Sequence, residues 1–264
     1  MPTVDIDGRT IGFEDTGGDG PTVLLLHGFL MDRSMFGPQV VELAPDFRCI
    51  TMDERGFGET PVTGPFTYWD LADDAVGLLD ELGVERAAFA GMSQGGFVAL
   101  RAALRYPDRV RALVLIATDA DVDDEETRGG YRQMFGTWRE HGPIDSITDT
   151  LADLILGDDQ ALRRHWIAKW KAIDPDALVE PVDCLLDRQA VSDRLGEIRC
   201  PALVVHGEDD VSIDISRAES MADALPDCRG LVRVPGAMHA ACLSHPAVVD
   251  PPLRAFLEAV VQEG

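Results

Sequence analysis

The chain has 264 residues, 45% of them hydrophobic, which is enough to bury a large core without disulfides or a metal. Its formal net charge of −24, from 47 acidic and 23 basic residues, disfavours nucleic acid as a partner and strongly anionic substrates as ligands. No run of about 18 apolar residues predicts a membrane span, and the N-terminus lacks the features of a signal peptide. We therefore expect a cytoplasmic protein with no membrane partner.

Short apolar runs alternate with amphipathic segments, which predicts a mostly parallel sheet covered by helices on both faces. The chain opens with segments near residues 3–7 and 10–15 that read as an antiparallel hairpin turning at Asp7-Gly8. Six apolar runs then predict the central strands, at residues 23–26, 48–52, 87–90, 112–116, 202–205 and 231–234. Helical spacing of apolar residues predicts helices over residues 71–82, 97–106, 215–225 and 253–261.

The segment 119–194 interrupts this alternation. It holds three of the four tryptophans and helix-like periodicity, but no convincing central strand. Because it begins directly after a predicted strand and the strand pattern resumes behind it, we expect a helical cap inserted into a core formed by residues 1–118 and 195–264. The alternative is a simple run of core helices.

The five cysteines are scattered along the chain without a C-x-x-C pair. This distribution predicts reduced, buried thiols rather than disulfides or a metal site. No cysteine has a recognisable histidine partner nearby in the sequence, so none is a candidate nucleophile.

The strongest chemical signal is Gly91-Met92-Ser93-Gln94-Gly95, a G-x-S-x-G pattern between a predicted strand and a predicted helix. A serine hydroxyl is a weak nucleophile and must be held where a base and a substrate reach it. A sharp strand-to-helix turn achieves this, and glycines on either side leave room for it. We therefore identify Ser93 as the candidate nucleophile.

Two backbone N–H groups are candidates for an oxyanion hole. The helix start behind the nucleophile supplies the N–H of Gln94, where negative charge develops on the substrate carbonyl oxygen. The loop after the first central strand, His27-Gly28-Phe29, supplies the N–H of Phe29. The Phe29 ring would also line the acyl pocket, and His27 is expected to bond the loop rather than act as a second base.

Six histidines compete for the role of general base. His239 lies late in the chain, after the last apolar run and before the last helix, where the order Ser…Asp…His requires the base. His245 is the next candidate. The orienting acid is expected in Gly207-Glu208-Asp209-Asp210, after the strand ending at His206; spacing alone does not separate its three carboxylates, and Asp119 is a further candidate.

With these residues in place, the chain resembles the α/β-hydrolase superfamily over nearly its whole length. The resemblance rests on five signatures in the expected order: His27-Gly28-Phe29, the loop Asp53 to Thr60, Gly91 to Gly96, Gly207-x-x-Asp210, and Ala237-Met238-His239. It implies the α/β-hydrolase fold, a structural role for the loop Asp53 to Thr60, and Asp210 and His239 as acid and base. Residues 71–116 look like the enol-lactonase and cofactor-free haloperoxidase (perhydrolase) group, mainly in scaffold positions.

These assignments predict hydrolysis of a small carboxylic ester or lactone through an acyl-enzyme on Ser93, with no metal or organic cofactor. We expect the cap to contribute pocket residues, for which the sequence offers Met134, Trp138, Trp166 and Trp170, each of them equally suited to the core of the cap. The alternatives are hydrolysis of a C–C bond next to a ketone by the same triad, and a small-molecule receptor with little turnover. The oligomeric state is not encoded in any of these patterns.

Overall fold

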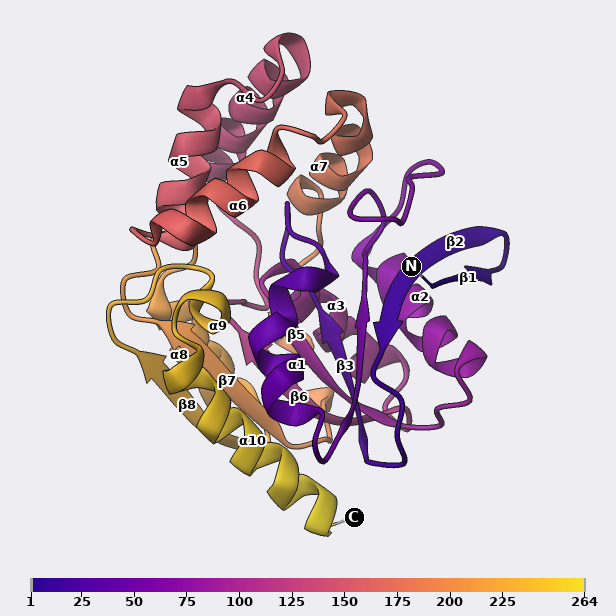
Figure 1. Ribbon diagram of the computed structural model, residues 1–264. Coiled ribbons are helices and arrows are strands. Elements are labelled where there is room, and N and C mark those ends of the chain that lie inside the picture. The colour runs from indigo at the N-terminus through magenta and orange to yellow at the C-terminus, as the bar shows by residue number, and fades with distance from the viewer. Residues whose placement is uncertain (1, 264) are drawn as a thin grey trace.

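The computed structural model describes residues 2–263 and contains one eight-stranded sheet (Figure 1). In chain order the strands are β1 (Thr3–Ile6), β2 (Arg9–Asp15), β3 (Thr22–Leu26), β4 (Arg48–Met52), β5 (Ala87–Met92), β6 (Val110–Ile116), β7 (Ala202–Gly207) and β8 (Cys228–Val234). Their order across the sheet is β1-β2-β4-β3-β5-β6-β7-β8. The six strands from β3 to β8 pair in parallel, whereas β1 and β2 form the antiparallel hairpin and β2 joins β4 antiparallel.

Each predicted strand is present, and the hairpin turns at Asp7 and Gly8, both with positive φ. The central strands are predictable because helices cover both of their faces. Along β3, Val23 and Leu25 pack into one core and Leu24 into the other. A strand buried on both sides has no solvent-facing positions, so it appears in the sequence as an unbroken apolar run.

Two groups of helices cover the sheet. Those on one face are α1 (Gly37–Leu43) and α10 (Pro246–Glu263), with the short α9 (Ala241–Ser244) beside them; those on the other face are α2 (Tyr68–Glu81), α3 (Gln94–Arg105) and α8 (Ile215–Ala224). Helix α2 begins at a capping box made by Thr67 and Asp70 and ends before Gly83, which has a φ of +67°. Asp214 caps α8 through the Ser216 N–H.

The last helix differs from its prediction. It begins at Pro246, seven residues before the expected start at Leu253, and contains Pro251 and Pro252 in its interior. Two adjacent prolines are normally a boundary signal, because proline lacks an N–H donor for the helical ladder. Here Val249 and Leu253, on either side of the prolines, are both fully buried, and this packing outweighs the local preference.

The segment between β6 and β7 folds into helices that lie over the carboxyl ends of the parallel strands (Figure 1). They are α4 (Glu125–His141), α5 (Asp145–Leu156), α6 (Gln160–Trp170), η2 (Pro175–Leu178), α7 (Val179–Leu186) and η3 (Ser192–Glu197). Within the described residues this segment contains no strand. We refer to α4–α7 as the cap; its treatment as a separate unit with bounds at 119 and 194 stays a prediction.

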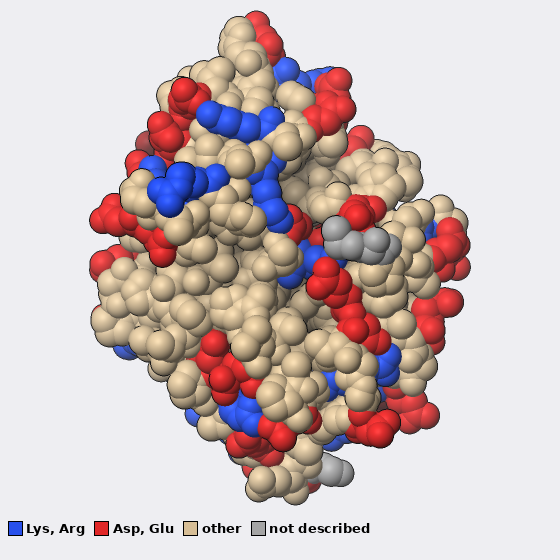
Figure 2. Space-filling view, viewed as in Figure 1, with Lys and Arg blue, Asp and Glu red and all other residues tan. Residues whose placement is uncertain are grey.

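No helix among residues 2–263 is long and apolar enough to cross a membrane. Acidic side chains are spread over cap and core on the face in Figure 2, and basic side chains lie beside many of them.

The cysteines form no disulfide; four are buried, and Cys228 on β8 is half-buried. Burial raises the thiol pKa of Cys49 and Cys200 to about 11 and that of Cys184 and Cys242 to about 12.

Candidate active site

Ser93 lies at the turn between β5 and α3. Its backbone has φ +50° and ψ −111°, a conformation that non-glycine residues adopt only when the surrounding structure enforces it. The Ser93 N–H donates to the Ile116 carbonyl at 2.8 Å, and the Ser93 carbonyl accepts from the Thr118 hydroxyl, also at 2.8 Å. Both bonds come from β6 and the residues after it, so the neighbouring strand holds the strained turn in place.

The glycines beside Ser93 make the close approach possible. A Cβ at Gly95 would collide with the Leu26 carbonyl at the end of β3, and a Cβ at Gly91 would collide with the Gly95 backbone. The G-x-S-x-G pattern is therefore required by packing between adjacent strands as well as by the turn. Because Gln94 is the first residue of α3, its N–H has no partner within the helix and is available to an anion.

His239 lies in the loop after β8, and its Nδ1 is 2.7 Å from Asp210 Oδ2. Asp210 follows β7 and is almost fully buried, and its other oxygen accepts from the backbone N–H groups of Ser212 (2.8 Å) and Ile213 (3.1 Å). His206 Nε2 lies 2.7 Å from the Ile213 carbonyl and 3.3 Å from Asp210 Oδ2. The carboxylate is thus fixed by two backbone donors and faces two imidazoles.

These contacts decide the charge of the acid. Burial alone raises the pKa of Asp210, but the charge of His239 and the hydrogen bonds from both histidines and the Ile213 backbone together hold that pKa well below its ordinary value. Asp210 is therefore ionised over the physiological range. A carboxylate at this place keeps the His239 proton on Nδ1 and leaves Nε2 for proton transfer.

The other acid candidates lie elsewhere. Asp119 is buried but pairs with Arg217 at 3.1 Å, and Glu208 and Asp209 are exposed. His245 contacts its neighbour Ser244 at 2.9 Å. Among these alternatives, only Asp210 makes a hydrogen bond with His239 within the part of the chain that the structure describes.

Ser93 and His239 line the same cavity, together with Phe29. No hydrogen bond joins the serine hydroxyl to the imidazole among residues 2–263. Catalytic hydrogen bonds of this kind often shorten only when substrate is bound. The structure therefore brings the serine, the histidine, the aspartate and Phe29 to one place at the carboxyl edge of the sheet.

The loop after β3 forms a tight turn, closed by a bond from the Met31 N–H to the Gly28 carbonyl at 3.0 Å. His27 is fully buried beneath it: its Nδ1 lies 2.8 Å from the Gly28 carbonyl, and its Nε2 accepts from the Glu54 N–H at 2.9 Å. Burial lowers the pKa of His27, so the ring is neutral and serves the loop rather than the chemistry. The Phe29 N–H donates no hydrogen bond within the described chain.

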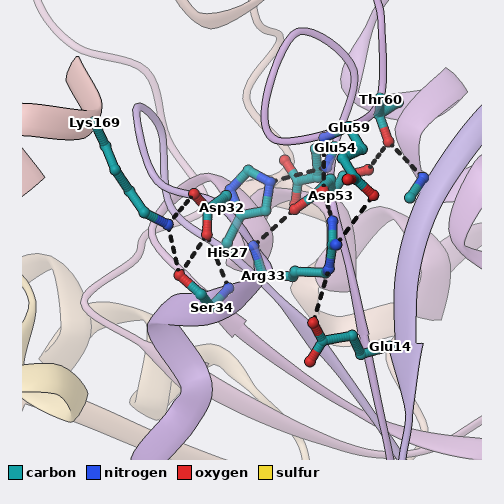
Figure 3. Close-up of polar contacts among 11 residues, drawn as sticks. Glu14, His27, Asp32, Arg33, Ser34, Asp53, Glu54, Glu59, Thr60 and Lys169 are labelled. Carbon is teal, nitrogen blue, oxygen red and sulfur yellow. Dashed lines mark hydrogen bonds and ion pairs between the residues drawn. The ribbon is translucent and has the colours of Figure 1, made fainter. Parts of the chain in front are cut away.

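A buried ion pair supports this loop from the core side, as Figure 3 shows. The guanidinium of Arg33 contacts the Asp53 carboxylate, and both side chains are nearly or fully buried. Asp53 also accepts from the backbone N–H groups of Arg33 (2.8 Å) and Glu59 (2.9 Å). The Thr60 hydroxyl donates to the Asp53 carbonyl at 2.8 Å and so ties together the two ends of the loop Asp53 to Thr60.

Replacing Asp53 by alanine is expected to destabilise the fold by roughly 3–5 kcal/mol, because it removes the buried carboxylate facing a buried guanidinium. The free energy of unfolding from urea titration measures this loss. The matched control is Glu197→Ala, which breaks the exposed Arg194–Glu197 pair and is expected to give no resolvable change. Equal stability of Asp53→Ala and the wild type would show that the buried pair does not support the loop.

The cavity is lined mainly by apolar side chains from both layers. The core supplies Phe29, Met31, Met92 and Phe97, and the cap supplies Tyr131 and Phe135 from α4 and Leu151, Leu154 and Ile155 from α5. The Phe29 ring meets Phe57 and Phe135 edge-on, each at 5.4 Å between ring centroids. The cap therefore forms the upper wall of the candidate site.

The cap side chains that line the cavity are not the ones that the sequence suggested for the pocket. Trp138, Trp166 and Trp170 are almost fully buried in the hydrophobic cluster that the cap shares with one face of the core, and neither they nor Met134 is among the residues that line the cavity. The cavity is lined instead by the apolar stripe Leu151, Leu154 and Ile155, whose i, i+3, i+4 spacing is a signal of a buried helix face but not of a ligand pocket.

Arg188 is a lining residue that the sequence analysis missed. It is almost fully buried, pairs with Asp123 at 3.0 Å and lies 4.6 Å from the centroid of the Phe97 ring. No motif surrounds it in the sequence. The cavity wall thus includes a charged pair, Arg188 and Asp123, in addition to the serine and the histidine.

Comparison with known proteins agrees with this geometry. The profile of the "alpha/beta hydrolase fold" family matches residues 21–246. A pimeloyl-[acyl-carrier protein] methyl ester esterase of Aeromonas hydrophila is 30% identical over 246 residues, covering 87% of this chain and 92% of the relative.

Two solved structures are similar over almost the whole chain. A thermophilic esterase from Thermogutta terrifontis, described as malate bound, has a TM-score of 0.88 at 31% identity and covers 98% of this chain and 97% of its own. An enol-lactonase from Burkholderia xenovorans LB400 has a TM-score of 0.88 at 24% identity and covers 97% and 100%, respectively, which supports the fold. With its parallel sheet, its strained serine turn and its profile match, this chain belongs to the α/β-hydrolase fold family.

Proposed function

We propose that the protein is a serine hydrolase that cleaves a carboxylic ester or lactone of a small molecule through an acyl-enzyme on Ser93. The observation that carries this proposal is that His239, which lines a cavity together with Ser93, is paired with the buried, ionised Asp210 behind it. The esterase and lactonase named among the similar structures support the same class of bond.

In the proposed reaction, Ser93 Oγ attacks the carbonyl carbon while His239 Nε2 takes the hydroxyl proton. The carbonyl electron pair moves onto oxygen, where the N–H groups of Phe29 and Gln94 stabilise the negative charge. Collapse of this intermediate breaks the C–O bond, and His239 donates its proton to the departing alkoxide. Water then attacks the acyl carbon and gives a proton to His239. When the bond between the acyl carbon and Ser93 Oγ breaks, His239 returns that proton to Oγ, which releases the acid and restores the serine hydroxyl.

The shape of the cavity supports a small, largely apolar substrate. Aromatic and aliphatic side chains from core and cap make up most of the lining beside Ser93 and His239, and a lining of low polarity strengthens electrostatic contacts within the site. The choice between an open-chain ester and a lactone is a matter of which leaving group fits beneath α4 and α5. A location in the cytoplasm stays a prediction.

The test is labelling with a fluorophosphonate probe followed by peptide mass spectrometry. We expect one adduct, on the peptide that contains Ser93, and no labelling after heat denaturation. Turnover is then measured on a panel of p-nitrophenyl esters and aliphatic lactones. An adduct on a different residue would remove the nucleophile assignment, and tight ligand binding without turnover would favour the receptor alternative.

A further inference from the structure

The turn that carries the Phe29 N–H is contacted by the cap as well as by the core. Helix α6 of the cap supplies two donors: Trp170 Nε1 bonds the Leu30 carbonyl at 2.9 Å, and Lys169 Nζ bonds Asp32 Oδ2 at 2.5 Å. Lys169 also reaches the Ser34 hydroxyl at 2.8 Å, as Figure 3 shows. These residues come from positions about 140 apart in the chain, so this contact is a tertiary one between cap and loop.

The residue that Trp170 contacts is strained. Leu30 has a φ of +62°, a conformation that L-residues other than Asn and Asp rarely adopt, and it is the third residue of the turn closed between Gly28 and Met31. Such a conformation persists only when surrounding contacts enforce it. The indole N–H of Trp170 bonds the carbonyl of this same residue, and both side chains are nearly or fully buried.

Asp32 is the second point at which the cap holds the loop. Its Oδ1 accepts from the Ser34 N–H at 2.9 Å and so caps the short helix η1 (Arg33–Phe36), while Lys169 takes the other oxygen. Burial raises the pKa of Asp32, but the bonds from Lys169 and Ser34 outweigh it, and the net pKa is lowered. Lys171, the other lysine of the chain, pairs with Asp145 inside the cap and does not reach the loop.

We propose that Trp170 and Lys169 are positioning residues that complete the oxyanion hole from the cap. They hold the turn Gly28–Met31 and the following Asp32 in the conformation that directs the Phe29 N–H toward the developing negative charge. This inference rests on the proposed function, because it gives the Phe29 N–H the role of an oxyanion donor. The cap then contributes to catalysis through this loop and is more than a wall of the pocket.

The kinetic test compares Trp170→Phe and Lys169→Met with the matched control Lys171→Met, using p-nitrophenyl butyrate. Removing an oxyanion donor outright costs about 10²- to 10³-fold in kcat, so loosening its loop is expected to cost roughly 10-fold, with KM changed less than about threefold. Lys171→Met is expected to keep wild-type kcat. Lys169→Arg, which retains a cation of similar reach, is expected to recover most of the loss of Lys169→Met.

Inhibition by 1,1,1-trifluoro-2-hexanone separates the oxyanion hole from substrate binding. Ser93 Oγ adds to the ketone carbon, its proton moves to His239, and the ketone oxygen becomes an oxyanion. Affinity for this inhibitor is expected to fall in parallel with kcat in Trp170→Phe and Lys169→Met. Unchanged kcat and unchanged inhibitor affinity in both folded variants would overturn the inference; if Trp170→Phe fails to fold, Lys169→Met alone decides.

Hydrogen exchange tests the same contact without relying on activity. Amide exchange in the peptide covering residues 28–36 is expected to rise at least about tenfold in Trp170→Phe. Trp138→Phe is the matched control, because the buried Trp138 indole N–H has no hydrogen-bond partner among the described residues. Equal amide exchange in Trp170→Phe and Trp138→Phe would contradict the positioning role, even if the wild type hydrolysed no ester. A wild type that shows neither turnover nor labelling of Ser93 would instead contradict the proposed function.

Discussion

Replacing Ser93 by alanine is expected to lower kcat on the best ester substrate by on the order of 10⁶-fold, because nucleophile, base and acid act as one unit. The residual rate would come from the oxyanion hole and from substrate binding. Alanine fits the site sterically, since it removes one oxygen and leaves the bonds of the Ser93 backbone to Ile116 and Thr118 in place. The measurement is steady-state kinetics, with circular dichroism to confirm that the variant folds.

The control for this variant is Ser220→Ala, since Ser220 is an exposed serine of α8 whose hydroxyl bonds the carbonyl of Ser216 in its own helix. Its kcat and KM are expected to equal those of the wild type. Retention of more than about one hundredth of the activity in Ser93→Ala, with no contaminating esterase in the preparation, would place the nucleophile elsewhere and end the acyl-enzyme proposal.

Replacing Asp210 by asparagine is expected to lower kcat by about 10⁴-fold. The amide oxygen can still accept from the Ser212 and Ile213 backbone, so the local fold is retained. The amide nitrogen, however, is a donor facing His239 Nδ1, and it forces the proton of the ring onto Nε2. His239 Nε2 then carries a hydrogen atom where it faces the Ser93 hydroxyl, so it cannot accept the proton of that hydroxyl.

Two matched variants separate Asp210 from the other acids that spacing allowed. Asp209→Asn changes the exposed neighbour, and Asp119→Asn changes the buried aspartate that pairs with Arg217. Both are expected to stay within about threefold of wild-type kcat, because neither carboxylate touches the imidazole. A 10⁴-fold loss in Asp119→Asn together with an active Asp210→Asn would move the acid to the end of β6.

The sheet and the nucleophile could be predicted from sequence because each leaves a local signal. A strand buried on both faces is a continuous apolar run, and a strained turn between strand and helix needs small residues at fixed places, here Gly91 and Gly95. The last helix could not be predicted from local preference. Pro251 and Pro252 lie inside α10 because burial of its apolar side chains outweighs the loss of two backbone N–H donors.

The acid and the pocket could not be derived locally. Glu208, Asp209 and Asp210 are consecutive, and only the bonds of Ser212 and Ile213 to Asp210 turn that side chain toward His239. The pocket residues of the cap are harder to predict than the acid, because an apolar stripe on a helix has the same sequence pattern whether it faces another helix or a cavity. Family resemblance selected Asp210, whereas it was silent about which cap residues reach the substrate.

The burial of the thiols has a practical consequence. A thiol reacts with maleimides and haloacetamides as the thiolate, and in Cys49, Cys184, Cys200 and Cys242 both access and ionisation are suppressed at neutral pH. Cys228 begins β8, the strand at the outer end of the sheet, and is the partly accessible cysteine among the described residues. Among the described cysteines, Cys228 is therefore the expected attachment point for a fluorescent dye on the native protein, on an edge strand well separated in the sheet order from the serine turn.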